Sequence, residues 1–145
     1  MNINKVVVIG SGTMGSGIAA HLCNANVPVV LLDLKTDIAE KAKERILKSR
    51  PPLLFEQSKI NSLKTGNISD DFENVSDADW IIEAVVERID IKHNIYDQIF
   101  KKRKKNSIVS SNTSTIPLKV LSQKLSDSDK KDFCITHFFN PVRYM

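Results

Sequence analysis

Short apolar runs alternate with segments of helical periodicity along the whole chain. The runs Lys5–Ile9, Val29–Leu32 and Trp80–Val86 are almost continuously apolar, as is typical of strands buried on both faces of a sheet. Between them, apolar residues recur every three or four positions, which is the spacing of one helix face. This alternation predicts an α/β fold: a Rossmann-type, doubly wound, mostly parallel sheet with helices on both faces, formed by residues 1–145 as one domain.

The remaining elements follow from the same pattern. We expect further strands at 107–110 and 133–136, and a loop over the polar residues 126–132. We expect helices from the glycine-rich turn to Pro28, from Thr36 to Arg50, over 89–104, and in a short stretch that Pro117 opens. Residues 51–75 lack a clean period, so we expect only a short helical excursion, a turn at Gly66-Asn67 and a small strand.

Composition is that of a globular domain, with 41% hydrophobic and 26% charged residues in a chain of 145. No apolar run approaches the ~20 residues that span a bilayer, so we expect no membrane insertion. Because Met1 leads almost directly into the first predicted strand, we expect no signal peptide. Cys23 and Cys134 lack metal-ligand spacing and are interpreted as reduced core residues, so we expect no metal and a cytoplasmic location.

A basic run, Lys101–Lys105, holds much of the net charge of +4. It has two interpretations: a patch for an anionic partner such as nucleic acid or the phosphates of coenzyme A, or the solvated last turn of a helix. No aromatic residue interrupts the run to stack on bases. We therefore favour the solvated turn and do not expect nucleic-acid binding.

A glycine-rich turn follows the first strand, with the sequence Gly10-Ser11-Gly12-Thr13-Met14-Gly15. Its G-x-G-x-x-G spacing between a strand and a helix is typical of a dinucleotide-binding βαβ unit. The first glycine permits the tight turn, the second lets the backbone approach a pyrophosphate, and the third lets the helix pack on the strand. The helix N-terminus then faces the phosphates with its free N–H groups.

Asp33 closes the second apolar run, about 20 residues beyond the glycines, where such units carry an acid. Its carboxylate can accept hydrogen bonds from the ribose hydroxyls of the adenosine. Because a carboxylate repels a 2′-phosphate, the sequence predicts a preference for NAD over NADP.

The predicted strand exits carry Gly10, Asp33, Ala84, Ser114 and His137. Ligands of open α/β sheets gather at this edge, beyond the carboxyl ends of the strands. His137 is the only histidine placed there, and imidazole titrates in the range that general acid–base catalysis needs. We therefore interpret His137 as a general acid or base.

Four motifs occur in a characteristic order: the glycine turn extended to Gly17, Ile82-Glu83-Ala84-Val85 with Glu87, Ser111-Asn112-Thr113-Ser114, and His137-Phe138-Phe139-Asn140-Pro141. In these motifs the sequence resembles the N-terminal, NAD-binding domain of the 3-hydroxyacyl-CoA dehydrogenases of fatty acid β-oxidation. The resemblance covers essentially all 145 residues. The Pro51-Pro52 insertion is similar to that of members in which this domain is part of a longer, multifunctional chain.

The resemblance implies NAD-dependent oxidation of 3-hydroxyacyl-CoA to 3-oxoacyl-CoA. It implies that His137 takes the proton of the 3-hydroxyl, that Ser114 hydrogen-bonds the reacting oxygen, and that Asn140 helps to place nicotinamide and substrate. The cofactor-binding residues it implies are Gly10, Ser11, Gly12, Thr13, Met14, Gly15, Asp33, Ala84, Glu87, Lys92, Ser114 and Asn140. Simpler roles stay open: Glu87 and Lys92 as ordinary residues of a helix start, and Ser114 as a helix cap.

The family places a glutamate partner for the histidine shortly after the Pro141 motif, and this sequence ends at Met145 before reaching it. The family's helical C-terminal domain, which forms the homodimer and completes the acyl-CoA cleft, is also absent. We therefore carry two alternatives: an NAD-binding module that is inactive alone or needs the missing domain or a partner chain, and another β-hydroxyacid dehydrogenase.

Overall fold

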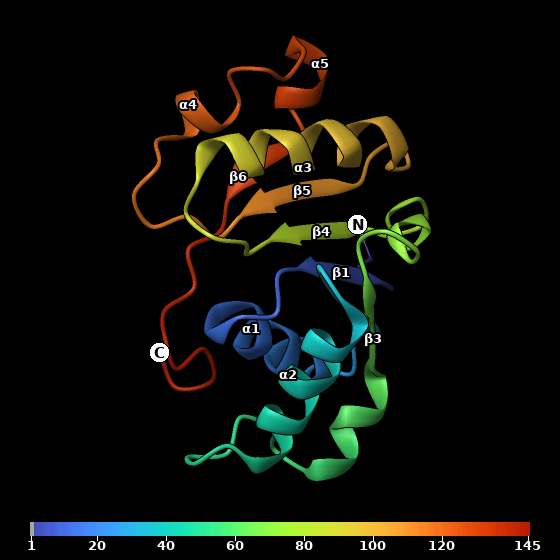
Figure 1. Cartoon of the computed structure of the whole chain (residues 1–145), viewed down its shortest axis with the longest axis vertical. Helices are drawn as coiled ribbons and strands as arrows, with labels where there is room; N and C mark the ends of the chain where they lie inside the picture. Colours follow the sequence, from blue (N-terminus) through green and yellow to red (C-terminus); the bar gives the residue numbers. More distant parts are fainter. Residues whose placement is uncertain (1) are drawn as a thin grey trace.

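The computed structural model describes residues 2–145, which contain a six-stranded sheet in the order β3-β2-β1-β4-β5-β6 (Figure 1). Every neighbouring pair of strands is parallel. The strands are β1 (Val6–Ile9), β2 (Val29–Asp33), β3 (Leu63–Asn67), β4 (Trp80–Glu83), β5 (Ile108–Ser111) and β6 (Phe133–Ile135). The chain starts in the middle, builds outward to β3, and then builds from β4 to the opposite edge. This reversal between β1 and β4 creates the crevice in which such sheets bind ligands.

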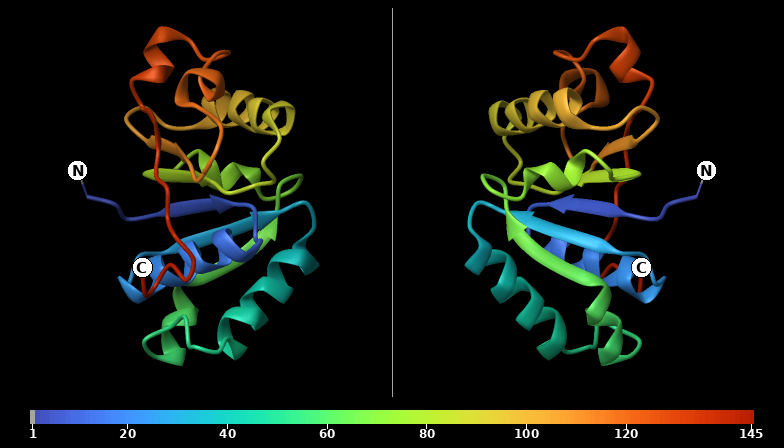
Figure 2. Two further views of the ribbon diagram at one scale, coloured as in Figure 1. Left: turned by 90° about the vertical axis from the view of Figure 1, so that its left-hand side faces the viewer. Right: turned by 90° about the vertical axis from the view of Figure 1, so that its right-hand side faces the viewer.

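Helices cover both faces of the sheet (Figure 2). They are α1 (Thr13–Asn24), α2 (Thr36–Lys48), α3 (Ile89–Lys102), α4 (Leu118–Leu121) and α5 (Asp127–Lys130), with 3₁₀ turns η1 (Gln57–Ser62) and η2 (Phe72–Val75). Alternate residues of β1 enter opposite cores: Val6 and Val8 pack with α1 and α2, whereas Val7 and Ile9 pack with α3. Burial on both faces explains why the strands are apolar without alternation.

The predicted doubly wound fold is confirmed, but several predicted boundaries were wrong. The strand predicted to reach Val86 ends at Glu83, because Ala84 to Val86 leave the sheet and line the cleft described below. The turn predicted at Gly66-Asn67 is the end of β3. A Cβ on Gly66 would lie 2.5 Å from a carboxylate oxygen of Asp71, so the glycine marks a close side-chain approach rather than a turn.

Other corrections are smaller. The loop predicted over 126–132 contains α5, capped by Ser126, whose hydroxyl accepts the N–H of Asp129. The helix predicted over 89–104 ends at Lys102. Cys23 is buried as expected, whereas Cys134 is only half-buried, and both thiols are free. Between residues 2 and 145, no helix is long and apolar enough to cross a membrane.

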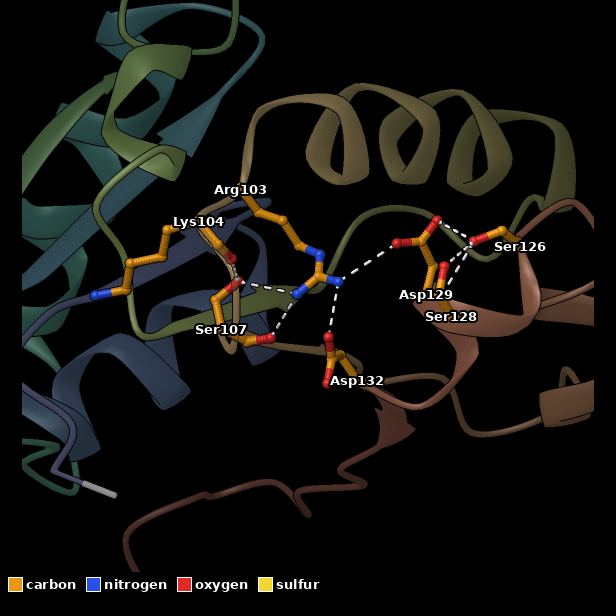
Figure 3. A network of polar contacts seen from close by, with 7 residues as sticks. All are labelled: Arg103, Lys104, Ser107, Ser126, Ser128, Asp129 and Asp132. Atoms are coloured by element: carbon orange, nitrogen blue, oxygen red, sulfur yellow. Dashed lines mark hydrogen bonds and ion pairs between the residues drawn. The ribbon is translucent and has the colours of Figure 1, made fainter.

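The basic run is largely neutralised within the fold. Lys101 pairs with Asp97, Lys102 with Glu73, and Lys104 with Asp79. Figure 3 shows the most buried member, Arg103, which donates to the carboxylate of Asp132 at 2.8 Å and to the carbonyl of Ser107 at 2.9 Å. Its guanidinium also lies 4.7 Å from the centre of the Phe100 ring. The run therefore ties the end of α3 to its surroundings. The solvated-turn interpretation is wrong for Arg103, whose side chain is only 9% exposed.

Candidate functional site

The glycine turn joins β1 to α1 by close backbone contacts. Gly10 has φ of +101°, and a Cβ on it would lie 2.5 Å from the carbonyl oxygen of Ala84. A Cβ on Gly15 would lie 1.8 Å from the carbonyl oxygen of Gly10, so α1 packs against the turn only with glycine there. A Cβ on Gly12, by contrast, would have no neighbouring atom within 4 Å. The backbone of Gly12 is therefore open to a ligand.

The first turn of α1 presents its positive end to this opening. Gly12 occupies the N-cap position and has no side chain to satisfy the N–H groups, and the first turn contains no acidic residue. Unsatisfied N–H groups and the helix dipole make such an end an anion site. The arrangement suits a pyrophosphate.

Asp33 lies at the end of β2, beside the glycine turn. Its Oδ2 accepts hydrogen bonds from the Ser11 N–H at 2.7 Å and the Ser11 hydroxyl at 2.6 Å, while Oδ1 accepts the Leu34 N–H at 2.7 Å. Arg45 of α2 donates to the carbonyl of Ser11 at 2.8 Å. Sequence reasoning missed Arg45, which no local pattern distinguishes from the other basic residues of α2.

A mostly apolar cavity of about 370 Å³ opens between Asp33 and the residues that follow β4. Its apolar walls come from both halves of the chain: Leu34, Ile38, Ile68, Val85, Val86, Ile91 and Ile95. A mostly apolar cavity with one carboxylate in its lining is suited to an adenosine group, and we call it the adenosine cavity.

A second cavity of about 470 Å³ adjoins the first and shares Gly12, Ala84, Val85 and Val86 with it. Its polar lining includes Glu87, Asn112, Ser114, His137 and Asn140, and its apolar lining includes Met14, Phe138 and Phe139. The structure thus brings together residues that follow β1, β4, β5 and β6. The three residues predicted to be catalytic, Ser114, His137 and Asn140, line this second cavity, next to the adenosine cavity.

The imidazole of His137 is exposed to this cavity and lies 4.6 Å from the Phe139 ring, measured between ring centres. Within residues 2–145, no carboxylate is hydrogen-bonded to it. Ser114 is also exposed and does not cap α4: the N–H of Ile116 is taken by the hydroxyl of Thr113, at 3.0 Å. The capping alternative for Ser114 is therefore wrong.

A buried polar cluster supports the wall of the second cavity, and sequence reasoning left its centre, Glu83, unassigned. The Glu83 carboxylate accepts from Lys92 Nζ, the Tyr96 hydroxyl and the Ser111 hydroxyl, each at 2.6 Å. The N–H of Val85 donates to it at 2.9 Å. Burial and the adjacent carboxylate raise the pKa of Tyr96, which keeps its hydroxyl protonated as a donor. An acid inside an otherwise apolar strand was the signal in the sequence.

Comparison with known proteins identifies the family. The family described as 3-hydroxyacyl-CoA dehydrogenase, NAD binding domain, matches residues 5–145. The chain belongs to this family. Over 99% of its length it is 47% identical to a putative fatty acid oxidation complex trifunctional enzyme of Rickettsia felis, and over 100% it is 40% identical to a probable 3-hydroxyacyl-CoA dehydrogenase of Deinococcus radiodurans.

The fold of the family is equally clear in solved structures. The crystal structure of 3-hydroxybutyryl-CoA dehydrogenase from Escherichia coli superposes with a TM-score of 0.87 at 28% identity and covers the whole of this chain. The chain spans only part of these relatives: 21% of the Rickettsia protein, 44% of the Deinococcus protein and 31% of the Escherichia chain.

The family's cofactor, NAD, fits the residues present. The open backbone at Gly12, the uncapped start of α1 and the carboxylate of Asp33 lie along the two adjoining cavities. These are the features that a pyrophosphate and an adenosine ribose require.

Glu87 and Lys92 of the predicted cofactor set differ in position. Glu87 lines the second cavity and accepts a hydrogen bond from the Thr113 hydroxyl. Lys92 is only 1% exposed: its Nζ bonds Glu83 and lies 3.9 Å from Glu87 Oε2. Lys92 therefore lies behind the cavity wall and lines neither of the two cavities. Its simpler interpretation, an ordinary charged residue of a helix start, is also wrong.

Proposed function

We propose that this chain is the NAD-binding, proton-transferring part of an enzyme that oxidises 3-hydroxyacyl-CoA to 3-oxoacyl-CoA in fatty acid β-oxidation. The main support for the proposal is that His137, Ser114 and Asn140 line one cavity, which adjoins the adenosine cavity. Family membership supports the reaction class.

Each residue has a defined task in this reaction. Bound NAD would supply the hydride acceptor for C3 of the substrate. The imidazole of His137 removes the proton of the 3-hydroxyl, so that a neutral ketone forms. The hydroxyl of Ser114 hydrogen-bonds the reacting oxygen, and the amide of Asn140 orients nicotinamide and substrate. The apolar side chains of Met14 and Phe139 at the rim exclude water from the reacting atoms.

The proposal includes an acyl-CoA substrate, a homodimer in the complete enzyme, and full turnover only in that complete enzyme. The imidazole of His137 has no hydrogen-bonded carboxylate within residues 2–145. A histidine base needs one to fix the tautomer of the neutral imidazole and to stabilise the imidazolium that forms. The chain matches only 21% of the Rickettsia relative and 44% of the Deinococcus relative. We propose that a further domain or a partner chain supplies that carboxylate and completes the cleft.

The test measures NADH binding by fluorescence and NADH oxidation with acetoacetyl-CoA. His137→Gln is expected to abolish turnover but to retain NADH binding. His93→Gln is the matched control, because His93 contacts the carbonyl of Val120, away from the cleft. Turnover by the chain alone supports the proposed reaction but contradicts the need for a further domain or partner chain. Binding without turnover, restored by an added helical domain, supports the module that needs a partner. Failure to bind NADH contradicts both.

The alternative of another β-hydroxyacid dehydrogenase is tested in the same assay with a free β-hydroxyacid and NAD. We expect no turnover of the free acid. Faster turnover of the free acid than of the coenzyme A thioester would contradict the proposed substrate class.

A further inference from the structure

The segment that carries His137 and Asn140 has no helix or strand of its own. After β6 ends at Ile135, residues 136–145 run as an irregular strap from the edge of the sheet past α1, as both views in Figure 2 show. Catalysis tolerates little displacement of an acid–base group, because a misplacement of about 1 Å can cost about 100-fold in rate. The position of the strap must therefore be set by contacts outside it.

The first anchor of the strap lies beside the sheet. The N–H of Thr136 donates to the carbonyl of Ser111 at 3.0 Å, which continues the strand pairing by one residue. The N–H of Phe138 donates to Asn112 Oδ1 at 2.9 Å. These contacts hold the strap before and just after His137, but they leave Asn140 and the remainder without support from the sheet.

The second anchor lies beyond Asn140, on α1. Val142 is only 5% exposed and belongs to the core between α1 and the sheet. A Cβ on Gly17 would lie 3.0 Å from a methyl group of Val142, so the strap docks where α1 has a glycine. A side chain there would push the strap away from α1.

Arg143 joins the strap to the loop after α2. Its Nη1 donates to the carbonyls of Pro52 and Leu54, both at 2.8 Å, and its guanidinium lies 4.7 Å from the centre of the Phe55 ring. The hydroxyl of Tyr144 also donates to the carbonyl of Pro52, at 2.8 Å. The side chains of Arg143 and Tyr144 thus both bind backbone carbonyls of the loop at residues 52–55.

The loop that receives Arg143 is itself held on α1. Asn24, at the end of α1, donates to the carbonyl of Leu53 at 2.9 Å and accepts the N–H of Phe55 at 2.8 Å. Asn24 is 7% exposed and Leu54 is 6% exposed, so the loop is a fixed surface rather than a free segment. The backbone that follows Pro51 and Pro52 is thereby fixed on α1.

We propose that Arg143, through the loop at residues 52–55, is a positioning residue that fixes the strap beyond Phe138. It thereby holds Asn140 and the Phe139 ring, which lies 4.6 Å from the His137 imidazole. The proposal rests on the proposed function for its catalytic consequence, but not for its structural one. Arg143 touches neither of the two cavities and takes no part in proton transfer. Its task is to hold the second end of a strap whose first end the sheet holds.

The structural consequence is read by histidine NMR on the full chain, which has three histidines. Arg143→Met keeps the aliphatic stem and removes the donors, and we expect it to shift or broaden the His137 imidazole signals while those of His93 stay in place. Arg50→Met is the matched control, because Arg50 donates only to the carbonyl of its neighbour Ser49. Unchanged His137 signals in folded Arg143→Met, or an equal change in Arg50→Met, would overturn the proposal.

The catalytic consequence is a split between kcat and KM. In the assay with the added helical domain, we expect Arg143→Met to lower kcat about tenfold, with KM for NADH within about twofold of the parent, and Arg143→Lys to recover part of the rate. If Arg143→Met does not fold, Tyr144→Phe replaces it, because this variant removes a single hydrogen bond to Pro52. We expect Tyr144→Phe to give a smaller shift of the His137 signals. The absence of any shift would overturn the proposal. Failure of the parent chain to bind NADH contradicts the proposed function alone, since the NMR comparison still decides the strap.

Discussion

Single residues in this chain are used where a side chain would obstruct or a charge must be held. Gly10 and Gly15 leave no room for a Cβ beside their backbone neighbours, whereas Gly12 leaves open space for a ligand. Glu83 is completely buried and yet has a donor for each of its oxygens. A buried carboxylate persists only when paired and hydrogen-bonded in this way.

Removal of the cation from this pair is expected to be costly. Lys92→Met leaves the Glu83 carboxylate buried without its counter-charge, so we expect the free energy of unfolding to fall by about 3–5 kcal/mol. Urea unfolding followed by circular dichroism measures it. Lys64→Met, at an exposed position of β3, is the control and should change stability by less than about 0.5 kcal/mol. Equal losses in the two variants would contradict the importance of the buried pair.

The thiol of Cys23 is expected to be inert in the folded chain. Burial raises its pKa to about 11, and the nearby Lys43 offsets only part of this shift. At pH 8 only about a thousandth of the thiol is thiolate, the reactive form, and the fraction rises about tenfold with each pH unit. Alkylation followed by mass spectrometry should modify the half-buried Cys134 first and Cys23 only after denaturation. Rapid labelling of native Cys23 at pH 8 would contradict its burial.

At the scale of elements, α3 supplies different functions along its length. Its first turns carry Lys92 and Tyr96, which hold Glu83 behind the cavity wall. Its last turn leads into Arg103, whose hydrogen bonds reach Ser107 before β5 and Asp132 before β6 (Figure 3). Arg103 of the basic run therefore connects the end of α3 to the segments before β5 and β6 at the edge of the sheet, a contact region that we call the α3 joint.

Substitution at this joint should affect stability and leave cofactor binding intact. Arg103→Met removes charge-assisted hydrogen bonds from a side chain that is only 9% exposed, so we expect a loss of about 1.5–3 kcal/mol. Lys101→Met removes an exposed i,i+4 pair with Asp97 and should cost about 0.3–0.5 kcal/mol. Thermal unfolding measures the stability of both variants, and a parallel NADH titration measures their cofactor affinity. A weaker NADH affinity in folded Arg103→Met would contradict the expectation that this contact region does not affect the cofactor cavities.

At the scale of the molecule, the two halves of the sheet meet to form one cleft. The adenosine cavity takes Asp33 and Ile38 from the first half and Val85 and Ile91 from the second. Neither half alone has both walls. We therefore expect the selection of NAD to depend on a carboxylate from one half and an apolar wall from the other.

Neutralising the carboxylate tests this selection. We expect Asp33→Asn to weaken NADH binding about tenfold, through loss of charge-assisted hydrogen bonds to the ribose, and to narrow the discrimination against NADPH, since the repulsion of a 2′-phosphate is gone. Fluorescence titration with both cofactors measures it. Asp37→Asn, in the exposed first turn of α2, should leave both affinities unchanged. An unaltered NADH/NADPH ratio in Asp33→Asn would refute the role of this carboxylate.

Local patterns in the amino-acid sequence were sufficient to predict the alternation of strands and helices, the glycine turn, and the meeting of Asp33, Ser114 and His137 at one edge. These features follow from local rules, because parallel strands end at a common edge and backbone geometry restricts where glycine is needed. In residues 51–75, the predicted short helical excursion and small strand are confirmed as η1 and β3. Their bounds could not be predicted, because 3₁₀ turns and a short strand have no sustained period.

Three features became evident only in the folded chain: where β4 ends, that Lys92 is buried on Glu83, and that Arg143 binds the loop at residues 52–55. The contacts of Arg143 and Tyr144 with this loop join residues 89 to 92 positions apart. Contacts over such separations depend on how α1 and the loop pack, and packing leaves no periodic trace in the chain. The local pattern therefore specified the candidate catalytic groups, and long-range packing determined the contacts that surround them.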